Sequence, residues 1–228
     1  MAEVNAPVPS QLIVTGQCEW KEVAPSIKAK VLWSDRQTNR QLRLTRFEPG
    51  AKLALHRHLG DELVYVIEGS ISDEFGTVRA GDLGYRPPQC VHTVTSANGA
   101  TALALLSGGA EPAKELGDGP RSRVIVPSDI GWTEVMPGMR RKALWNDEAN
   151  GRRADLVRFE PGAQIPLHRH LGDELIFVLE GSNADEWGEV LTGNVSYRPP
   201  GCVHTVTTRN GATLLAFISG SAELVRQT

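Results

Sequence analysis

The six histidines of this chain fall into two groups with the same internal spacing, and a glutamate occupies the same place in each group. Every member of the first group lies 112 residues before its counterpart in the second. The two sets are His56, His58, Glu62 and His92, and His168, His170, Glu174 and His204. Neutral imidazole is the commonest metal ligand in proteins, and carboxylate oxygen can bind beside it. The pattern therefore predicts two equivalent metal sites, one in each half of the chain.

The spacing within a set is typical of ligands carried on β-strands. Residues i and i+2 of a strand project from the same face, so His56 and His58 would point together. Glu62 follows a Leu-Gly-Asp turn and can fold back beside them, while His92 comes from a later strand after Pro87. This nitrogen and oxygen set suits a divalent ion of zinc, iron, manganese, nickel or cobalt.

The same offset runs through most of the chain and predicts two domains. It holds without insertion from Trp20 to Gly108, which match Trp132 to Gly220. Residues 46–70 and 158–182 differ at only six of 25 positions. The segment between the repeats is rich in glycine, proline and charge, as linkers are. We expect domains at 1–110 and 123–228, joined by a linker at 111–122.

Short apolar runs and turn formers indicate an all-β fold. Runs of Val, Leu, Ile and Tyr are separated by turn sequences such as Glu48-Pro49-Gly50 and Asn98-Gly99. No long stretch has the 3.6-residue period of a helix, so a barrel or sandwich is expected. In residues 62–67 both faces of the predicted strand are apolar. The second face must be covered either by another sheet layer or by a domain or subunit interface.

The composition is that of a globular protein with little net charge. Of its 228 residues 40% are hydrophobic and 22% charged, and the net charge is −3. This excludes a strongly basic surface for nucleic acid, and no apolar run is long enough for a membrane span. The first residues lack a signal sequence, and three cysteines (Cys18, Cys90, Cys202) do not suggest a disulfide framework. We expect a cytoplasmic protein without nucleic-acid or membrane partners.

The histidine and glycine spacings resemble those of the cupin superfamily. Its first motif, G-x5-H-x-H-x3-E-x6-G, is matched by Gly50, His56, His58, Glu62 and Gly69, and again by Gly162, His168, His170, Glu174 and Gly181. Its second motif, G-x5-P-x-G-x2-H-x3-N, is matched by Gly81, Pro87 and His92, and by Gly193, Pro199, Gly201 and His204. Gln89 replaces the motif glycine, and Ser96 and Thr208 replace its asparagine. The resemblance implies two tandem cupin barrels, which are jelly-roll-like.

Within that superfamily the chain resembles the cupin domain of the ChrR anti-sigma factors. The resemblance lies in the SDEFG and ADEWG tracts at 72–76 and 184–188, the 11-residue gap between motifs, and the RPPxCVHT segments. It implies that the eight residues named above hold zinc, with Fe2+, Mn2+ or Ni2+ as alternatives. In that family anti-sigma activity belongs to a separate helical domain, so we do not expect this chain to bind a sigma factor directly.

Several other repeated residues have two interpretations. Cys90 and Cys202 would line the metal pocket or, as we favour, act as small buried hydrophobes. The arginines would orient an anionic ligand or, as we favour, pair with the acidic residues at 73–74 and 185–186. For the tyrosines we expect packing with a satisfied hydroxyl rather than a hydrogen bond to a ligand. These residues are Arg46, Arg86, Arg158, Arg198, Tyr85 and Tyr197.

Two functions fit these sites. The first is a metal-binding sensor or regulatory module that takes a small-molecule ligand. The alternative is a non-haem iron dioxygenase acting on a diketone or hydroxylated aromatic compound. Tetrahedral zinc would be saturated by three histidines and a glutamate, whereas octahedral iron would keep two positions free. Either role is compatible with a homo-oligomer.

Overall fold

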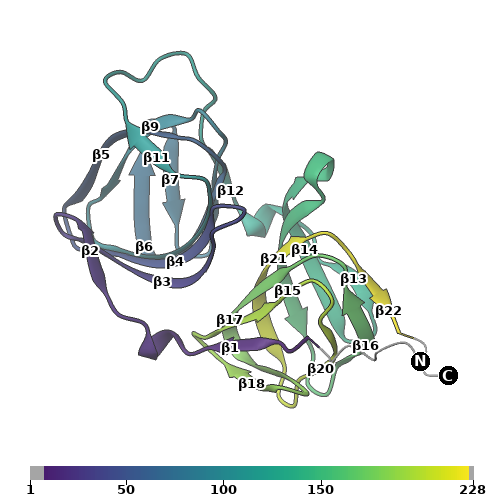
Figure 1. Ribbon diagram of the computed structural model, residues 1–228. Helices are drawn as coiled ribbons and strands as arrows, with labels where there is room; N and C mark the ends of the chain where they lie inside the picture. Colours follow the sequence, from purple (N-terminus) through teal and green to yellow (C-terminus); the bar gives the residue numbers. More distant parts are fainter. Residues whose placement is uncertain (1–7, 226–228) are drawn as a thin grey trace. The chain divides into compact units, whose positions relative to one another are not determined.

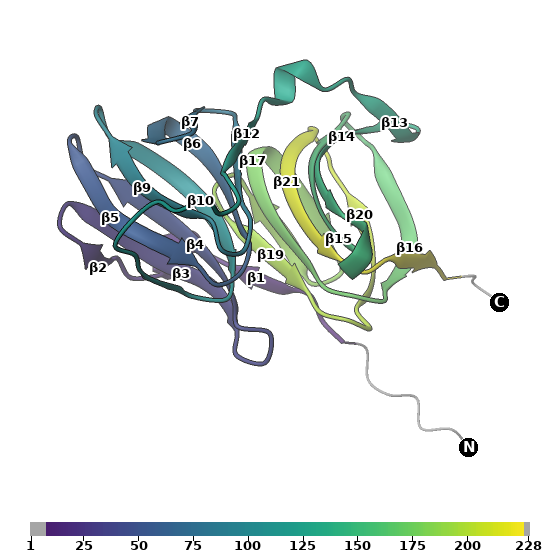
Figure 2. The same cartoon turned by 90° about the horizontal axis from the view of Figure 1, so that it is seen from above.

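The computed structural model describes residues 8–225, which are mostly β-strand (Figure 1). The strands form two antiparallel sheets of eleven strands, and each sheet curls around its own core (Figure 2). Helical structure among the described residues is limited to three 3-10 turns, Thr15–Gln17, Pro127–Asp129 and Glu148–Asn150. The predicted all-β fold of two barrels is therefore confirmed. Within residues 8–225 no helix is long and apolar enough to cross a membrane.

The first barrel follows the strand order β11-β5-β9-β6-β10-β4-β3-β2, with β7, β8 and β12 paired beside this path. Its strands are β2 (Lys21–Ala24), β3 (Ile27–Asp35), β4 (Arg40–Phe47), β5 (Ala51–His58), β6 (Glu62–Asp73), β7 (Gly76–Arg79), β8 (Leu83–Arg86), β9 (Val91–Ser96), β10 (Ala100–Ser107), β11 (Ala110–Pro112) and β12 (Arg123–Ile125).

The long strand β6 connects the two layers of this barrel. Its first half pairs with β8 and β10, and its second half pairs with β7 and β9. The inward side chains Val64, Val66 and Ile71 belong to a buried apolar core. On the other face Leu63 and Tyr65 are also buried, as expected for a strand with two apolar faces.

The second barrel repeats this arrangement with the order β22-β16-β20-β17-β21-β15-β14-β13, and with β18, β19 and β1 beside it. Its strands are β1 (Gln11–Ile13), β13 (Thr133–Met136), β14 (Met139–Asp147), β15 (Arg152–Phe159), β16 (Gln164–His170), β17 (Glu174–Asp185), β18 (Gly188–Leu191), β19 (Val195–Arg198), β20 (Val203–Thr207), β21 (Ala212–Ser219) and β22 (Ala222–Leu224).

The leading strands of the two repeats are exchanged. Strand β1 precedes the first repeat but pairs with β19 of the second barrel (Figure 2), where Leu12 lies opposite Ser196. Strand β12 precedes the second repeat but pairs with β8 of the first barrel, where Val124 lies opposite Gly84. The two pairings have the same register when shifted by 112 residues. Each barrel is therefore completed by a strand from the other repeat.

This exchange changes the division of the chain. The compact units are 17–129, and 130–225 together with 8–16. The sequence-based boundaries at 110 and 123 differ from these, because the repeat alone does not show which sheet edge receives each leading strand. Residues 1–7 and 226–228 of the expected domains lie outside the described part of the chain.

The departure of Gln89 from the second cupin motif leaves the turn conformation intact. Gln89 has a φ of 68°, and Gly201 at the equivalent position has a φ of 85°. The backbone N–H of Gln89 donates to the carbonyl of His58 at 2.8 Å, and that of Gly201 to His170 at 2.7 Å. Glutamine therefore adopts the left-handed conformation that glycine takes without steric cost.

We predict that Gln89→Gly stabilises the first barrel by about 1 kcal/mol, because it removes the steric cost of a left-handed side-chain residue. Gly201→Gln is the matched control and should destabilise the second barrel by a similar amount. Urea unfolding followed by tryptophan fluorescence and circular dichroism measures both changes. A loss of stability in Gln89→Gly would show that the glutamine side chain makes a stabilising contact.

Candidate metal centres

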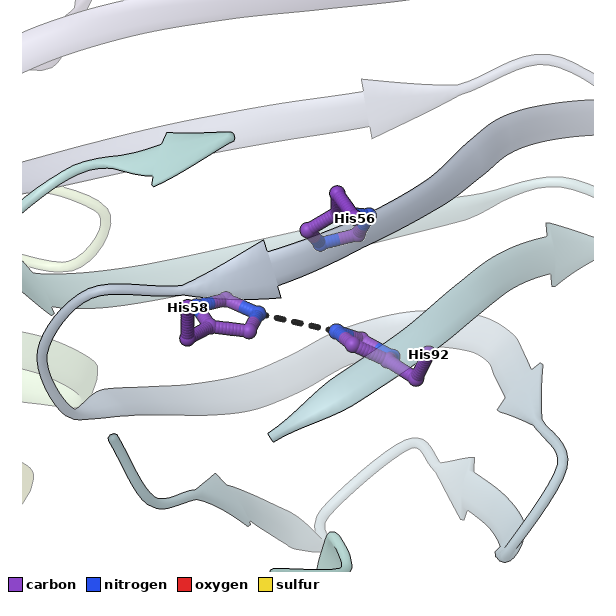
Figure 3. A group of neighbouring side chains, drawn as sticks. All are labelled: His56, His58 and His92. Carbon is purple, nitrogen blue, oxygen red and sulfur yellow. Dashed lines mark hydrogen bonds between the residues drawn. The ribbon is translucent and has the colours of Figure 1, made fainter. Parts of the chain in front are cut away.

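Three imidazoles meet inside the first barrel. His56 and His58 lie on β5 and His92 on β9, and the antiparallel register places His56 opposite His92. Figure 3 shows the three rings together, with the Nε2 atoms of His58 and His92 2.8 Å apart. The potential ligand atoms of the three residues all lie within 4.8 Å of one another.

The second barrel has the same group. His168 and His170 lie on β16, and His204 on β20 is opposite His168. The Nε2 atoms of His170 and His204 are 2.9 Å apart, and the three ligand atoms again lie within 4.8 Å. All six histidines of the sequence thus enter two groups that could each hold one metal ion.

The Nδ1 atoms of His56 and His92 face protein oxygen atoms, which leaves their Nε2 atoms available as ligands. His56 Nδ1 lies 2.8 Å from the carbonyl of Ala54, so an Nδ1–H donates there. His92 Nδ1 faces Asp73 Oδ2 at 3.4 Å. Burial lowers the pKa of His58 to about 4, despite the opposing effect of Glu62. Burial also lowers the pKa of His56, so the rings of His56 and His58 are neutral near pH 7, as metal ligands must be.

Glu62 lies beside the histidines but outside the group of three. Its Oε2 is 3.8 Å from His58 Nε2 and 3.4 Å from Arg86 Nη1. Burial would raise the pKa of Glu62, but Arg86 and the neighbouring imidazoles lower it overall. In the second barrel Arg198 donates to Glu174 at 2.9 Å. That either glutamate ligates a metal stays a prediction, because each carboxylate also has an arginine partner.

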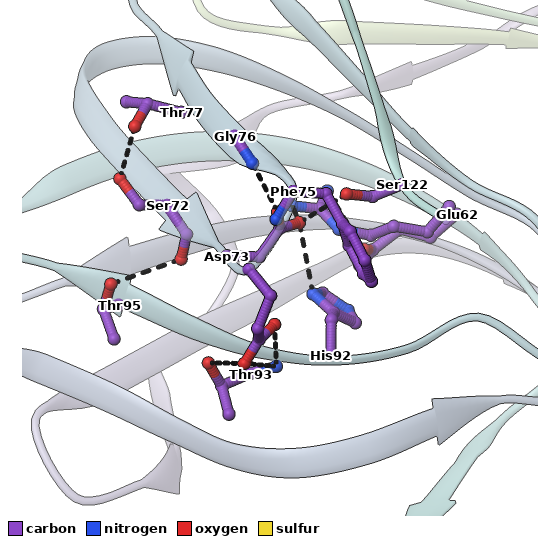
Figure 4. Close-up of polar contacts among 12 residues, drawn as sticks. Glu62, Ser72, Asp73, Phe75, Gly76, Thr77, His92, Thr93, Thr95 and Ser122 are labelled. Atoms are coloured by element: carbon purple, nitrogen blue, oxygen red, sulfur yellow. Dashed lines mark hydrogen bonds and ion pairs between the residues drawn. The ribbon is translucent and has the colours of Figure 1, made fainter. Parts of the chain in front are cut away.

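Asp73, whose side chain is buried, orients the third histidine of the first centre. We did not identify it from the sequence as part of the site. Asp73 contacts both His92 and Arg86. It also accepts a hydrogen bond from Ser122 at 2.7 Å, and Figure 4 shows it between Ser122 and His92. Burial opposes ionisation, but hydrogen bonds from His92 and Ser122 and the charge of Arg86 hold the pKa of Asp73 at about 2. A carboxylate on the second nitrogen of a ligand histidine fixes its ring and tautomer.

In the second barrel the corresponding aspartate also contacts the third histidine, and its serine partner comes from the other repeat. Asp185 faces His204 Nδ1 at 3.4 Å and accepts from Ser10 at 2.8 Å. Ser10 precedes exchanged strand β1, just as Ser122 precedes β12. The only sequence signal was the 112-residue offset between these serines, which does not reveal the exchange.

The charge of each centre fits a divalent cation. At neutral pH Glu62 and Asp73 are ionised, and Arg86 neutralises only one of them. One net negative charge therefore lies beside the three imidazoles. Such a centre attracts a cation more strongly than it would in water, because the surroundings are poorly polarisable. The nitrogen-rich donor set favours a transition metal or zinc over Ca2+ or Mg2+.

Each centre opens into a cavity that could admit a small molecule. The first cavity has a volume of about 360 Å³ and is lined by His56, His58 and Glu62 among mostly apolar side chains. The second has about 600 Å³ and is lined by His168, His170 and Glu174 in the same way. A metal ion held here would be accessible from the barrel interior.

The other repeated residues behave largely as expected. Cys90 and Cys202 are fully buried and do not line either cavity, and burial raises the pKa of each thiol to about 11. Tyr85 donates its hydroxyl proton to Asp61 at 2.8 Å. These results favour packing roles for the cysteines and for Tyr85.

The arginine prediction is right for one pair and wrong for the other. Arg86 and Arg198 contact Asp73 and Asp185, as expected, and also the site glutamates. The guanidinium groups of the other pair instead lie over tryptophan rings, each 4.8 Å from the centroid. These contacts are Arg46 with Trp20 and Arg158 with Trp132.

The family is decided by a match over both repeats. The model of the ChrR cupin-like domain matches residues 9–110 and 120–222. The chain belongs to this family. No curated protein sequence matches this cupin chain. Its membership therefore rests on the two domain matches, and the solved structures add information on the fold.

Solved structures show the same bicupin fold at low sequence identity. A protein from Nostoc punctiforme described as a "putative dioxygenase" is similar with a TM-score of 0.82 and 13% identity, covering 96% of this chain and 87% of that one. Oxalate decarboxylase from Bacillus subtilis gives 0.68 and 18%, covering 96% and 79%. A further structure of that decarboxylase is described with Mn(II) centres.

We predict that His92→Ala removes about one equivalent of metal from protein reconstituted with Zn(II), because the two centres lie in separate barrels. His204→Ala is the mirror control and should also leave about one equivalent. The double variant should retain almost none, as measured by elemental mass spectrometry. Retention of both ions by the single variants would contradict the assignment of these ligands.

We also predict that the metal-free protein loses stability as the pH falls from about 6.5 to 4. The folded-state pKa of His58 and of His170 is about 4, against 6.5 for an ordinary histidine, so only the unfolded chain takes up protons in this window. The loss at pH 5 should be about 2 kcal/mol for each histidine. Unfolding midpoints across this range measure the effect.

The double variant His58→Asn/His170→Asn is the control for this pH dependence. It should have a flatter stability profile between pH 6.5 and 4, because two of the responsible imidazoles are gone. An unchanged slope would assign the effect to other groups. Asp73 loses its contribution mainly below about pH 4, because the carboxylate pKa is 3.8 in the unfolded chain and about 2 in the fold.

Proposed function

We propose that this chain is a metal-dependent bicupin enzyme, a dioxygenase that adds both atoms of O2 to a small organic molecule. The observation that carries this proposal is that two histidines of each centre line a cavity. A metal held only for structure is saturated by protein ligands and does not need such access. A catalytic ion needs free positions and a path for substrate.

The residues around each centre suit oxidative chemistry on an organic substrate. Iron(II), when bound, would supply the redox chemistry that makes O2 reactive. The three imidazoles would hold the ion, and the negative charge from Glu62 and Asp73 would stabilise it. Apolar side chains such as Val64 and Ile71 would exclude water from the reacting molecule. A diketone or hydroxylated aromatic compound fits this mixture of a polar centre and apolar walls.

A second candidate is a zinc-dependent sensor that binds a regulatory ligand. It is favoured by the 3.8 Å approach of Glu62 to His58 and of Glu174 to His170. A small shift of either carboxylate away from its arginine would complete a four-ligand set. Four protein ligands saturate a tetrahedral zinc ion, so the regulatory molecule would bind beside the ion and would not coordinate it.

Metal identity and oxygen uptake separate the two candidates. Protein purified from its native host should contain iron, and anoxic reconstitution with Fe(II) should give oxygen uptake when a panel of diketones and hydroxylated aromatics is added. The control is the His56→Ala/His168→Ala variant, which should show no uptake above free Fe(II). Zinc at two equivalents, with no uptake for any compound, would favour the sensor.

A further inference from the structure

The two cavities differ at one inward position of the repeat. Ile71 on β6 lines the first cavity, and Asn183 on β17, 112 residues later, lines the second. Their side chains are equally hidden, with residue exposures of 2% and 1%. An apolar side chain in one barrel is therefore replaced by an amide in the other, within the same surroundings.

The side-chain amide of Asn183 is buried and unpaired among the described residues. Neither its Nδ2 nor its Oδ1 makes a hydrogen bond within the described part of the chain. The cavity around it is largely apolar, with Phe159, Ile176 and Val206 among its lining residues. Leaving a buried amide unpaired lowers the stability of the fold, and nearly all buried polar groups in proteins are paired. A polar occupant of the cavity would satisfy it.

The second cavity is also more polar than the first at other lining positions. Arg141 and Arg153 line it, at positions where the first repeat has Ala29 and Gln41, and Asp155 lines it where the first cavity has Arg43. Both arginines contact Asp155 Oδ2 at 3.1 Å, while Asp155 Oδ1 is buried and makes no hydrogen bond with residues 8–225. With about 600 Å³ against 360 Å³, this cavity also has more room.

We propose that the second cavity selects a small, largely apolar molecule carrying a hydroxyl or carbonyl group, and that Asn183 hydrogen-bonds that group. The first cavity, with Ile71 at this position, lacks the selectivity. The inference deepens the proposed function and rests on it, because the same cavity contains the second metal centre. It assigns substrate recognition mainly to the second barrel.

Trapped water is the competing occupant. The cavity is large enough for several water molecules, and an amide offers them two donors and an acceptor. Water alone would satisfy Asn183 without any selectivity for an organic ligand. The two cases therefore differ in whether changing the amide alters the affinity for a molecule with a polar oxygen relative to its apolar analogue.

The test compares the affinities of the full-length protein for 4-fluorophenol and for 4-fluorotoluene. Fluorine NMR measures the binding of each compound. Wild type should bind 4-fluorophenol about tenfold more tightly than Asn183→Ile does, while 4-fluorotoluene should bind both proteins about equally. Asn183→Ile places the residue of the first repeat in the second, and Asn183→Leu is a near-isosteric second variant. Ile71→Asn is the control outside the second barrel and should leave tight phenol binding in place.

Thermal unfolding of the metal-free proteins gives a second readout. Asn183→Ile should raise the unfolding midpoint of the second barrel, because it removes an unpaired amide, and Ile71→Asn should lower that of the first. A lower midpoint for both Asn183 variants, with unchanged phenol affinity, would make Asn183 a structural residue and overturn the proposal. Failure of the wild type to bind either probe, or to prefer the phenol, would also overturn it.

Metal content distinguishes this inference from the proposed function. If the phenol preference depends on Asn183 but the protein neither holds iron nor consumes oxygen, the proposed function fails and the selectivity remains. If oxygen uptake is present but the preference is unchanged in Asn183→Ile and Asn183→Leu, the enzyme remains and this inference fails.

Discussion

The register between β5 and β9 is the constraint on which the site depends. It places His56 directly opposite His92, and the two-residue period of the strand adds His58 on the same side. A slip of one residue would turn these imidazoles to the outer face of the barrel. The pairing shifts between Leu53 and His56, just before the ligands, and the same irregularity precedes His168 in the second barrel. A local departure from regular pairing therefore sets where the ligands meet.

Buried charge holds the imidazoles in place once the strands have brought them together. Arg86 is only 1% exposed, and removing such a group from water is costly unless it has partners. Its two carboxylate neighbours provide them, and one of these carboxylates also faces His92. The arginine thus keeps negative charge close to the metal centre without neutralising it completely. The same small group of buried charges therefore lies where it would affect both the stability of the barrel and its affinity for a metal ion.

Much of this organisation could be predicted from the sequence, because it is periodic. The doubled histidine spacing identified the residues that converge, and the turn formers between short apolar runs identified an all-β fold. The role of Asp73 could not be predicted, since the DE pair at 73–74 gave no sign of which carboxylate turns inward. Asp73 does so, whereas Glu74 accepts hydrogen bonds from Thr93. The strand exchange was equally hidden, because it depends on which sheet edge is open, and a repeat gives both edges the same sequence.

The exchange has a consequence for how a duplicated chain of this kind can arise. In a single repeat with the same pairing, the sheet edge at β8 would be open. The leading strand of a second copy would then pair with this edge. The ancestral form would then be a homodimer whose assembly depends on protein concentration. Fusing the two copies makes the pairing intramolecular, at an effective concentration in roughly the millimolar range for a short flexible connection. Fusion also allows the halves to mutate separately, and the difference between Ile71 and Asn183 is the kind of divergence that a symmetric dimer cannot have.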